Sequence, residues 1–132
     1  MAITSYLYQI LILLKKKELI SFGKTNSILE IGEQNWYGDV SFQDLEKTIN
    51  DYSDSKNKEI LHRKLNEITT LTELGKDPKT FAFDTVKLFY KAIFDYKEYL
   101  ALDLQGTEHS INFDLNQEYK DVKKYDVVTN IG

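Results

Sequence analysis

Polar residues suited to binding a ligand follow several short apolar runs of the sequence. Gly32 closes the first run, and Asp103, Asp114 and Asn130 stand near the ends of three later ones. An ionised carboxylate has only acceptors, so Asp103 could take two hydrogen bonds from the vicinal hydroxyls of a ribose. Asp114 could accept from the exocyclic amine of a base, and Leu115 could form an apolar wall for it. The pattern predicts a site for a nucleoside-containing ligand.

Each of these residues also has an ordinary structural explanation. Aspartate favours turns, so a single acid at the end of a strand is more often a turn residue than a ligand-binding one. Gly32 lets the backbone approach a ligand closely, because glycine has no Cβ atom. Several strand ends that each offer a polar group favour binding more than any one of them does.

The spacing of apolar residues indicates the elements that must position this site. Positions repeating every three or four residues predict helices, and short apolar runs predict strands. The expected helices cover residues 4–21, two segments within 39–80, and a stretch from Asp84, as N-cap, to Phe94. The expected strands cover residues 28–31, 99–104, 110–115 and 125–129.

This order of elements predicts an α/β, Rossmann-like domain over residues 1–132 with a mainly parallel sheet of about four strands. Residues 39–80 form a helical insertion between its first and second strands. Ligands of such sheets bind beyond the carboxyl ends of the strands, where the candidate residues stand. Seven residues, 104–110, separate Asp103 from Ile111, fewer than a parallel crossover usually needs. The direction of strand 111–114 therefore stays open.

Composition narrows the function classes. The chain has 132 residues, no cysteine and a net charge of −4, so we expect a reducing, cytoplasmic location and no nucleic-acid partner. The most apolar stretch, residues 6–14, is about half as long as a membrane span, and no membrane association is expected. Neither His62 nor His109 has a second ligand at metal-binding spacing, so no metal is expected.

Three segments together resemble a known family. "ILEIGEQNWYGD", "YLALDLQGTEHSINFDLN" and "YDVVTNIG" are similar to class I S-adenosylmethionine-dependent methyltransferases, in particular to members with a degenerate first glycine motif and a helical insertion. The resemblance covers residues 27–38 and 84–132. It implies S-adenosylmethionine as cofactor and methyl transfer to a small-molecule or unknown acceptor.

The resemblance also implies which residues bind the cofactor. Glu30 and Gly32 match the first motif, against the methionine part, and Gln34 follows in the same turn. The remaining matches are Asp103 with Leu104 for the ribose, Asp114 with Leu115 for the adenine, and Asn130 with Gly132 near the sulfonium.

Two departures from the family keep other functions open. Glu33 and Gln34 stand where glycines are common, and the chain ends at Gly132, whereas family members continue. The resemblance therefore implies an N-terminal cofactor-binding portion, with the activity belonging to a longer protein. A non-catalytic interaction domain and another nucleotide-binding α/β domain are the alternatives. The missing glycines argue against a dinucleotide, whose pyrophosphate needs a close approach to the backbone.

The segment 39–80 would form a lid or a contact between copies in a homo-oligomer.

Overall fold

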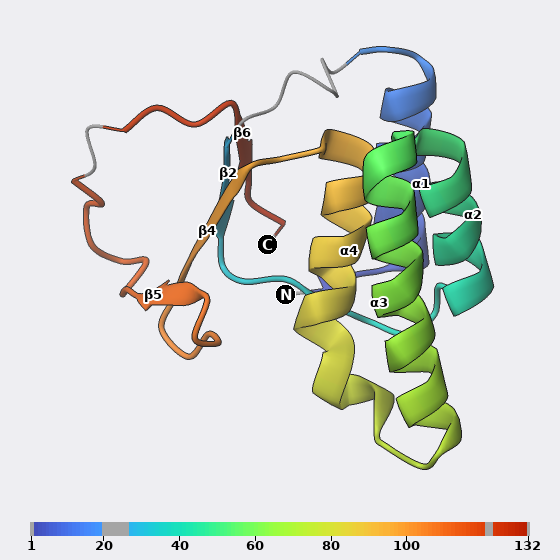
Figure 1. Cartoon of the computed structure of the whole chain (residues 1–132). Coiled ribbons are helices and arrows are strands. Elements are labelled where there is room, and N and C mark those ends of the chain that lie inside the picture. The colour runs from blue at the N-terminus through green and yellow to red at the C-terminus, as the bar shows by residue number, and fades with distance from the viewer. Residues whose placement is uncertain (1, 20–26, 121–122, 132) are drawn as a thin grey trace.

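A computed structural model describes residues 2–19, 27–120 and 123–131 of the chain (Figure 1). The helices are α1 (Ser5–Lys16), α2 (Phe42–Tyr52), α3 (Ser55–Glu73), the 3-10 helix η1 (Pro78–Phe81) and α4 (Ala82–Phe94). The strands are β1 (Ala2–Ile3), β2 (Ser27–Ile31), β3 (Asn35–Trp36), β4 (Glu98–Asp103), β5 (Ser110–Asn112) and β6 (Val127–Thr129).

The main sheet has four parallel strands in the order β5-β4-β2-β6. Numbered along the chain within this sheet, the order is 3-2-1-4, which is the order of a Rossmann-like sheet up to its fourth strand. The expected α/β fold with a parallel sheet is thereby confirmed. A separate two-stranded parallel sheet joins β1 to β3.

The strand after the short link, β5, pairs parallel to β4, which establishes the direction that the sequence left open. The link between them, residues 104–109, contains no helix and turns back tightly. A Cβ atom on Gly106 would lie 2.1 Å from Ser110 Oγ and 2.9 Å from Asp103 Cβ. Only glycine fits this position without a shift, and it is what allows so short a link.

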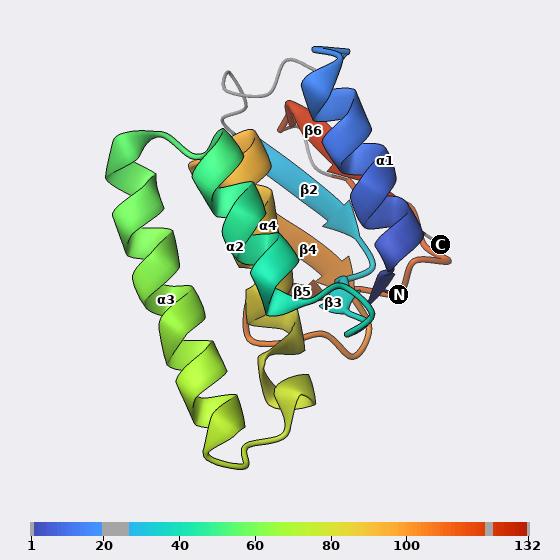
Figure 2. The ribbon, with the colours of Figure 1, turned by 90° about the vertical axis from the view of Figure 1, so that its right-hand side faces the viewer.

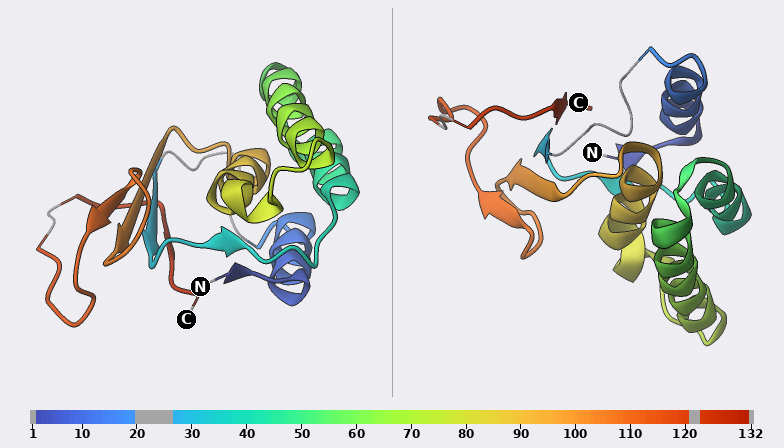
Figure 3. Two further views of the ribbon diagram at one scale, coloured as in Figure 1. Left: turned by 90° about the horizontal axis from the view of Figure 1, so that it is seen from below. Right: turned by 45° about the horizontal axis from the view of Figure 1, so that its top comes forward.

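All four α-helices lie on one side of the main sheet (Figures 1 and 2). Side chains alternate along β2, so Ile28 and Glu30 face the helices while Leu29 faces the opposite side. Seen from below, residues 113–120 run on that opposite side, away from the helix layer (Figure 3). The hydrophobic core therefore lies between the sheet and a single layer of helices.

The centre of this core is α4, most of whose residues are buried. The ring of Phe89 is fully buried, with its centroid 5.3 Å from that of Tyr8, 5.6 Å from Trp36 and 6.0 Å from Tyr90. Trp36 Nε1 donates to the Val40 carbonyl at 3.1 Å. These aromatic contacts connect α4 to α1 and to the segment after β2.

Several element boundaries differ from the sequence-based expectation. Asp84 is not an N-cap, because it lies inside the first turn of α4, and η1 precedes that helix with Asp77 as its own cap. The first helix ends at Lys16 rather than at residue 21, and residues 20–21 lie outside the described residues. The strand expected over 110–115 ends at Asn112, so Asp114 and Leu115 lie in the following turn.

The aromatic core generates a prediction about stability. Phe89→Ala should lower the free energy of unfolding by about 3–5 kcal/mol, because it removes a fully buried ring and leaves a cavity. Tyr37→Ala is the matched control: this ring is 68% exposed, and its loss should cost no more than about 0.5 kcal/mol. Urea unfolding of both variants measures the difference, and equal costs would contradict the assignment of Phe89 to the core.

Candidate functional site

The carboxyl ends of the parallel strands meet at one edge of the sheet. Gly32 follows β2 directly, has a φ of +78° that favours glycine, and donates its N–H to the Leu102 carbonyl at 2.8 Å. Asp103 ends β4, and Asn130 follows β6. The strand order reverses between β2 and β6, so Gly32 and Asn130 stand at the point where such sheets bind ligands.

Asp103 holds the turn after β2 against the end of β4. Its Oδ2 accepts the Glu33 N–H at 2.9 Å, and its Oδ1 accepts the Gln105 N–H at 2.8 Å. The residue is partly exposed. An ionised carboxylate has about four lone-pair positions, so each oxygen keeps one for a further donor.

Glu33 forms a buried ion pair that the sequence did not reveal. Its side chain is fully buried, and its carboxylate accepts from Lys87 Nζ at 3.1 Å. It also accepts from the N–H of Thr107 at 2.6 Å and from the hydroxyl of Thr107 at 2.8 Å. This carboxylate therefore connects the turn after β2 to α4 and to the link between β4 and β5.

Glu30 is also fully buried, on the helix-facing side of β2. Its carboxylate accepts from the hydroxyl of Tyr90 at 2.9 Å, from the hydroxyl of Tyr99, and from the N–H of Gln34 at 3.0 Å. Burial raises the pKa of Glu30, opposed by these three hydrogen bonds and reinforced by the nearby charge of Glu33. Its oxygens point into the core and hold the turn from behind.

Gln34 contains an unpaired acceptor at the reversal point. Its Nε2 donates to the carbonyls of Gly32 at 2.9 Å and Ile131 at 3.3 Å, and these two acceptors fix the orientation of the amide. Its Oε1 is buried and has no hydrogen-bond partner among the residues that the structure describes. A buried acceptor without a donor is costly and marks a position where a donor would be stabilised.

The other expected site residues lie on the surface. Leu104 is 55% exposed and Leu115 is 45% exposed. Asp114 accepts from the N–H and side-chain amide of Asn116 in a local turn, and these bonds lower its pKa. The structure thus gathers Glu30, Gly32, Gln34, Asp103 and Asn130 at one edge, and it places Asp114 two residues beyond the end of β5. Gly132 lies outside the described residues.

The sequence held a signal for the buried contacts of Glu30 and none for those of Glu33. An acid in the middle of an apolar strand, as Glu30 is, needs hydrogen-bond donors when it is buried, and the nearby tyrosines supply them. The contacts of Glu33 with Lys87 and Thr107 span 54 and 74 positions, and no spacing rule connects residues so far apart.

The chain was also compared with known proteins. No protein-family model, no curated protein and no solved structure matches it. Within the described ranges, no three His, Cys, Asp or Glu side chains are grouped so that they could hold a metal ion. None of the helices in those ranges combines the length and the apolar character that crossing a membrane requires.

The environment of Glu30 predicts a pH dependence of stability. Its folded-state pKa lies above the ordinary value of 4.5, so the folded chain holds this proton more tightly than the unfolded chain. The resulting stabilisation is complete below pH 4.5 and is lost as the pH rises through the folded-state pKa. The stability of the wild type relative to Glu30→Gln should therefore fall with rising pH over this window.

Chemical denaturation at a series of pH values tests this expectation. Glu46→Gln, which changes an exposed carboxyl group on α2, is the matched control and should keep the pH dependence of the wild type. A Glu30→Gln variant whose pH dependence equals that of the wild type would refute the raised pKa.

Proposed function

We propose that this chain is the cofactor-binding portion of a class I methyltransferase that transfers the methyl group of S-adenosylmethionine to an unknown acceptor. The observation that carries the proposal is the strand order 3-2-1-4, with Gly32 and Asn130 at its reversal point and Asp103 at the end of the adjacent strand β4. In such sheets this point is the usual ligand site. A cytoplasmic location and a small-molecule acceptor belong to the same proposal.

The residues present fit the chemical groups of this cofactor. Asp103 keeps one free lone-pair position on each oxygen, which suits the two hydroxyls of a ribose. Gly32 lets the chain approach closely at the end of β2. The Oε1 of Gln34, which has no partner among the described residues, suits an ammonium donor.

Glu30 acts through the turn rather than by contact in this proposal. Its carboxylate is fully buried and accepts from Tyr90, Tyr99 and the N–H of Gln34, so it is not open to a ligand. The hydrogen bond to Gln34 fixes the turn in which Gly32 lies. Glu30 is accordingly a positioning residue for the candidate site.

The methyl-transfer step itself needs few groups from the protein. The bound cofactor supplies a methyl group already activated by a sulfonium. The protein's task is to hold the acceptor in line with that methyl group and to exclude water. Gly32, Gln34 and Asp103 would serve the first part of that task by fixing the cofactor at the sheet edge.

The structure also favours this cofactor over a dinucleotide. Residues 33–41 continue through β3, and the next helix begins only at Phe42. No helix N-terminus follows Gly32 directly to accept a pyrophosphate, and S-adenosylmethionine has none.

A non-catalytic interaction domain is the second candidate. The observation that favours it is the internal saturation of Glu30 and Glu33, whose carboxylates are occupied by groups of the protein itself. Such a domain would keep the fold and bind no cofactor.

Calorimetric titration with S-adenosylhomocysteine separates the two candidates. We expect micromolar binding by the chain, and a loss of about ten-fold or more in affinity for Asp103→Ala, since two charge-assisted hydrogen bonds to the ribose would be missing. NAD should not bind.

Asp77→Ala provides the matched control. It removes an aspartate that caps η1 and lies away from the sheet edge, so its affinity should equal that of the wild type. Circular dichroism establishes that each variant is folded. A folded wild-type chain that binds no S-adenosylhomocysteine would favour the interaction domain, and tight binding of NAD would favour another nucleotide-binding domain.

A further inference from the structure

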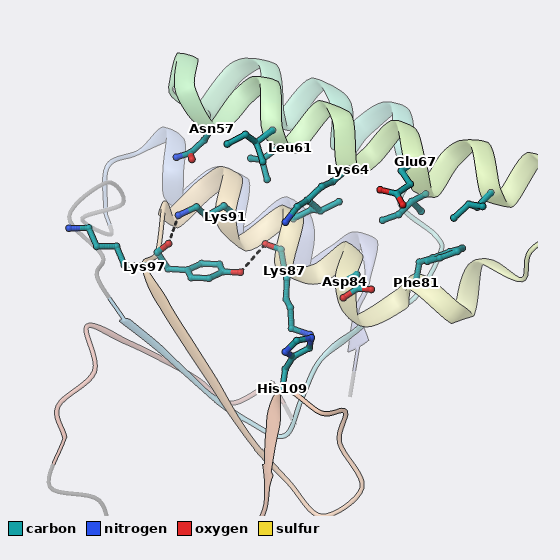
Figure 4. A pocket seen from close by; sticks show the side chains of 15 residues that line it. Asn57, Leu61, Lys64, Glu67, Phe81, Asp84, Lys87, Lys91, Lys97 and His109 are labelled. Carbon is teal, nitrogen blue, oxygen red and sulfur yellow. Dashed lines mark hydrogen bonds between the residues drawn. The ribbon is translucent and has the colours of Figure 1, made fainter.

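A groove of about 680 Å³ lies between α3 and α4, and His109 at the edge of β5 forms part of its wall (Figure 4). Buried apolar side chains of both helices form its floor: Leu61 and Ile68 from α3, and Leu88 from α4. Charged side chains stand around this floor. The groove is therefore an amphipathic surface on the helix layer, and it adjoins the candidate cofactor site at Lys87, which pairs with Glu33.

The wall of the groove formed by α3 carries a regular pattern. Its members alternate in steps of three and four residues, and they are Asn57, Ile60, Lys64, Glu67 and Leu71. This spacing is the heptad seam along which two helices pack in a coiled coil. Leu74, three residues further on, continues the seam and is 78% exposed. We call this set of residues the α3 seam.

The α3 seam is complementary to a second copy of itself. If two α3 helices lie antiparallel about a two-fold axis between residues 65 and 66, Lys64 of each copy stands opposite Glu67 of the other. In the same register, Ile60 stands opposite Leu71. Charge meets opposite charge at the centre, and apolar side chains meet on both sides of it.

The charges around the groove repeat this complementarity. Lys64 and Lys97 lie toward the end of the groove marked by Asn57, and Glu67 and Asp84 lie toward the other end (Figure 4). None of these four side chains forms an ion pair within the described part of the chain, whereas Lys87 and Lys91, in the same groove, pair with Glu33 and Asp95. A two-fold axis would bring the basic end of one copy against the acidic end of the other.

We propose that the α3 seam is the contact of a homodimer in which the two α3 helices pack antiparallel. The helix has 19 residues and is about 28 Å long, enough for two to three heptads of contact. An unrelated amphipathic helix would also find apolar contacts here, but the symmetry of the charges singles out a second copy of this chain. The contact does not depend on cofactor binding.

Sedimentation velocity on the whole chain, at concentrations up to about 200 µM, tests this dimer, because even a weak complex is populated there. The wild type should dimerise. Lys64→Glu and Glu67→Lys should each weaken the dimer by about ten-fold or more, because each places like charges opposite each other twice across the axis. Both side chains are exposed, so the variants should keep the fold, which circular dichroism checks.

Two recombinations of these substitutions give the sharpest result. The double variant Lys64→Glu/Glu67→Lys should dimerise like the wild type. An equimolar mixture of the two single variants should form a heterodimer, because both carboxylates of one chain then face the two lysines of the other. Altered charge pairing within each helix cannot explain that rescue, since the same like-charged pairs remain inside both helices of the mixture.

The possible results either support or overturn the proposed dimer. A weakened dimer in both single variants, restored in the mixture, supports the antiparallel register. A wild type that stays monomeric throughout overturns the proposal, as does a dimer that none of the substitutions affects. Capture of a helical peptide by a monomeric wild type would also overturn it and would assign the groove to another partner.

Discussion

The fold depends on one buried carboxylate. Glu30 sits in the central strand β2 and faces the helix layer, where an unsatisfied charge would be very costly. Its partners come from four places: Tyr90 from α4, Tyr99 from β4, Thr129 from β6, and the N–H of Gln34 from the turn beyond the strand. The same group that would destabilise the core therefore fixes the helix layer, the neighbouring strand and the turn in one arrangement.

The geometry of the candidate site follows from that arrangement. With the turn fixed at Gln34, the N–H of Glu33 points to Asp103, and the side chain of Glu33 reaches Lys87 and Thr107. Two buried acids thus fix the site together: Glu30 on the helix-facing side of the sheet, and Glu33 at its edge. Asp103, at the same edge, is partly exposed.

Local patterns were enough to predict the four α-helices and the parallel four-stranded sheet, and also the gathering of Gly32, Asp103 and Asn130 at one edge, but not β1, β3 or η1. They depend on periodicity and on the rule that parallel strands end together. The direction of β5 could not be predicted, because a link of six residues is shorter than a parallel crossover usually needs. The ion pair of Glu33 also escaped prediction, since it depends on contacts distant in sequence, whereas the position of Glu30 inside an apolar strand was a signal of its buried contacts. Asp114 was placed in a strand because an apolar run continued past the last residue that pairs with β4.

The position of β2 in the sheet has a consequence for the order of folding. Its two neighbours, β4 and β6, are separated from it in sequence by the helices α2 to α4 and by most of the rest of the chain. Synthesis from the N-terminus therefore releases an apolar strand with both edges unpaired while the local helical contacts already form. During that interval β2 is the segment most exposed to pairing with another nascent chain, and the arrival of β4 ends the exposure on one side only.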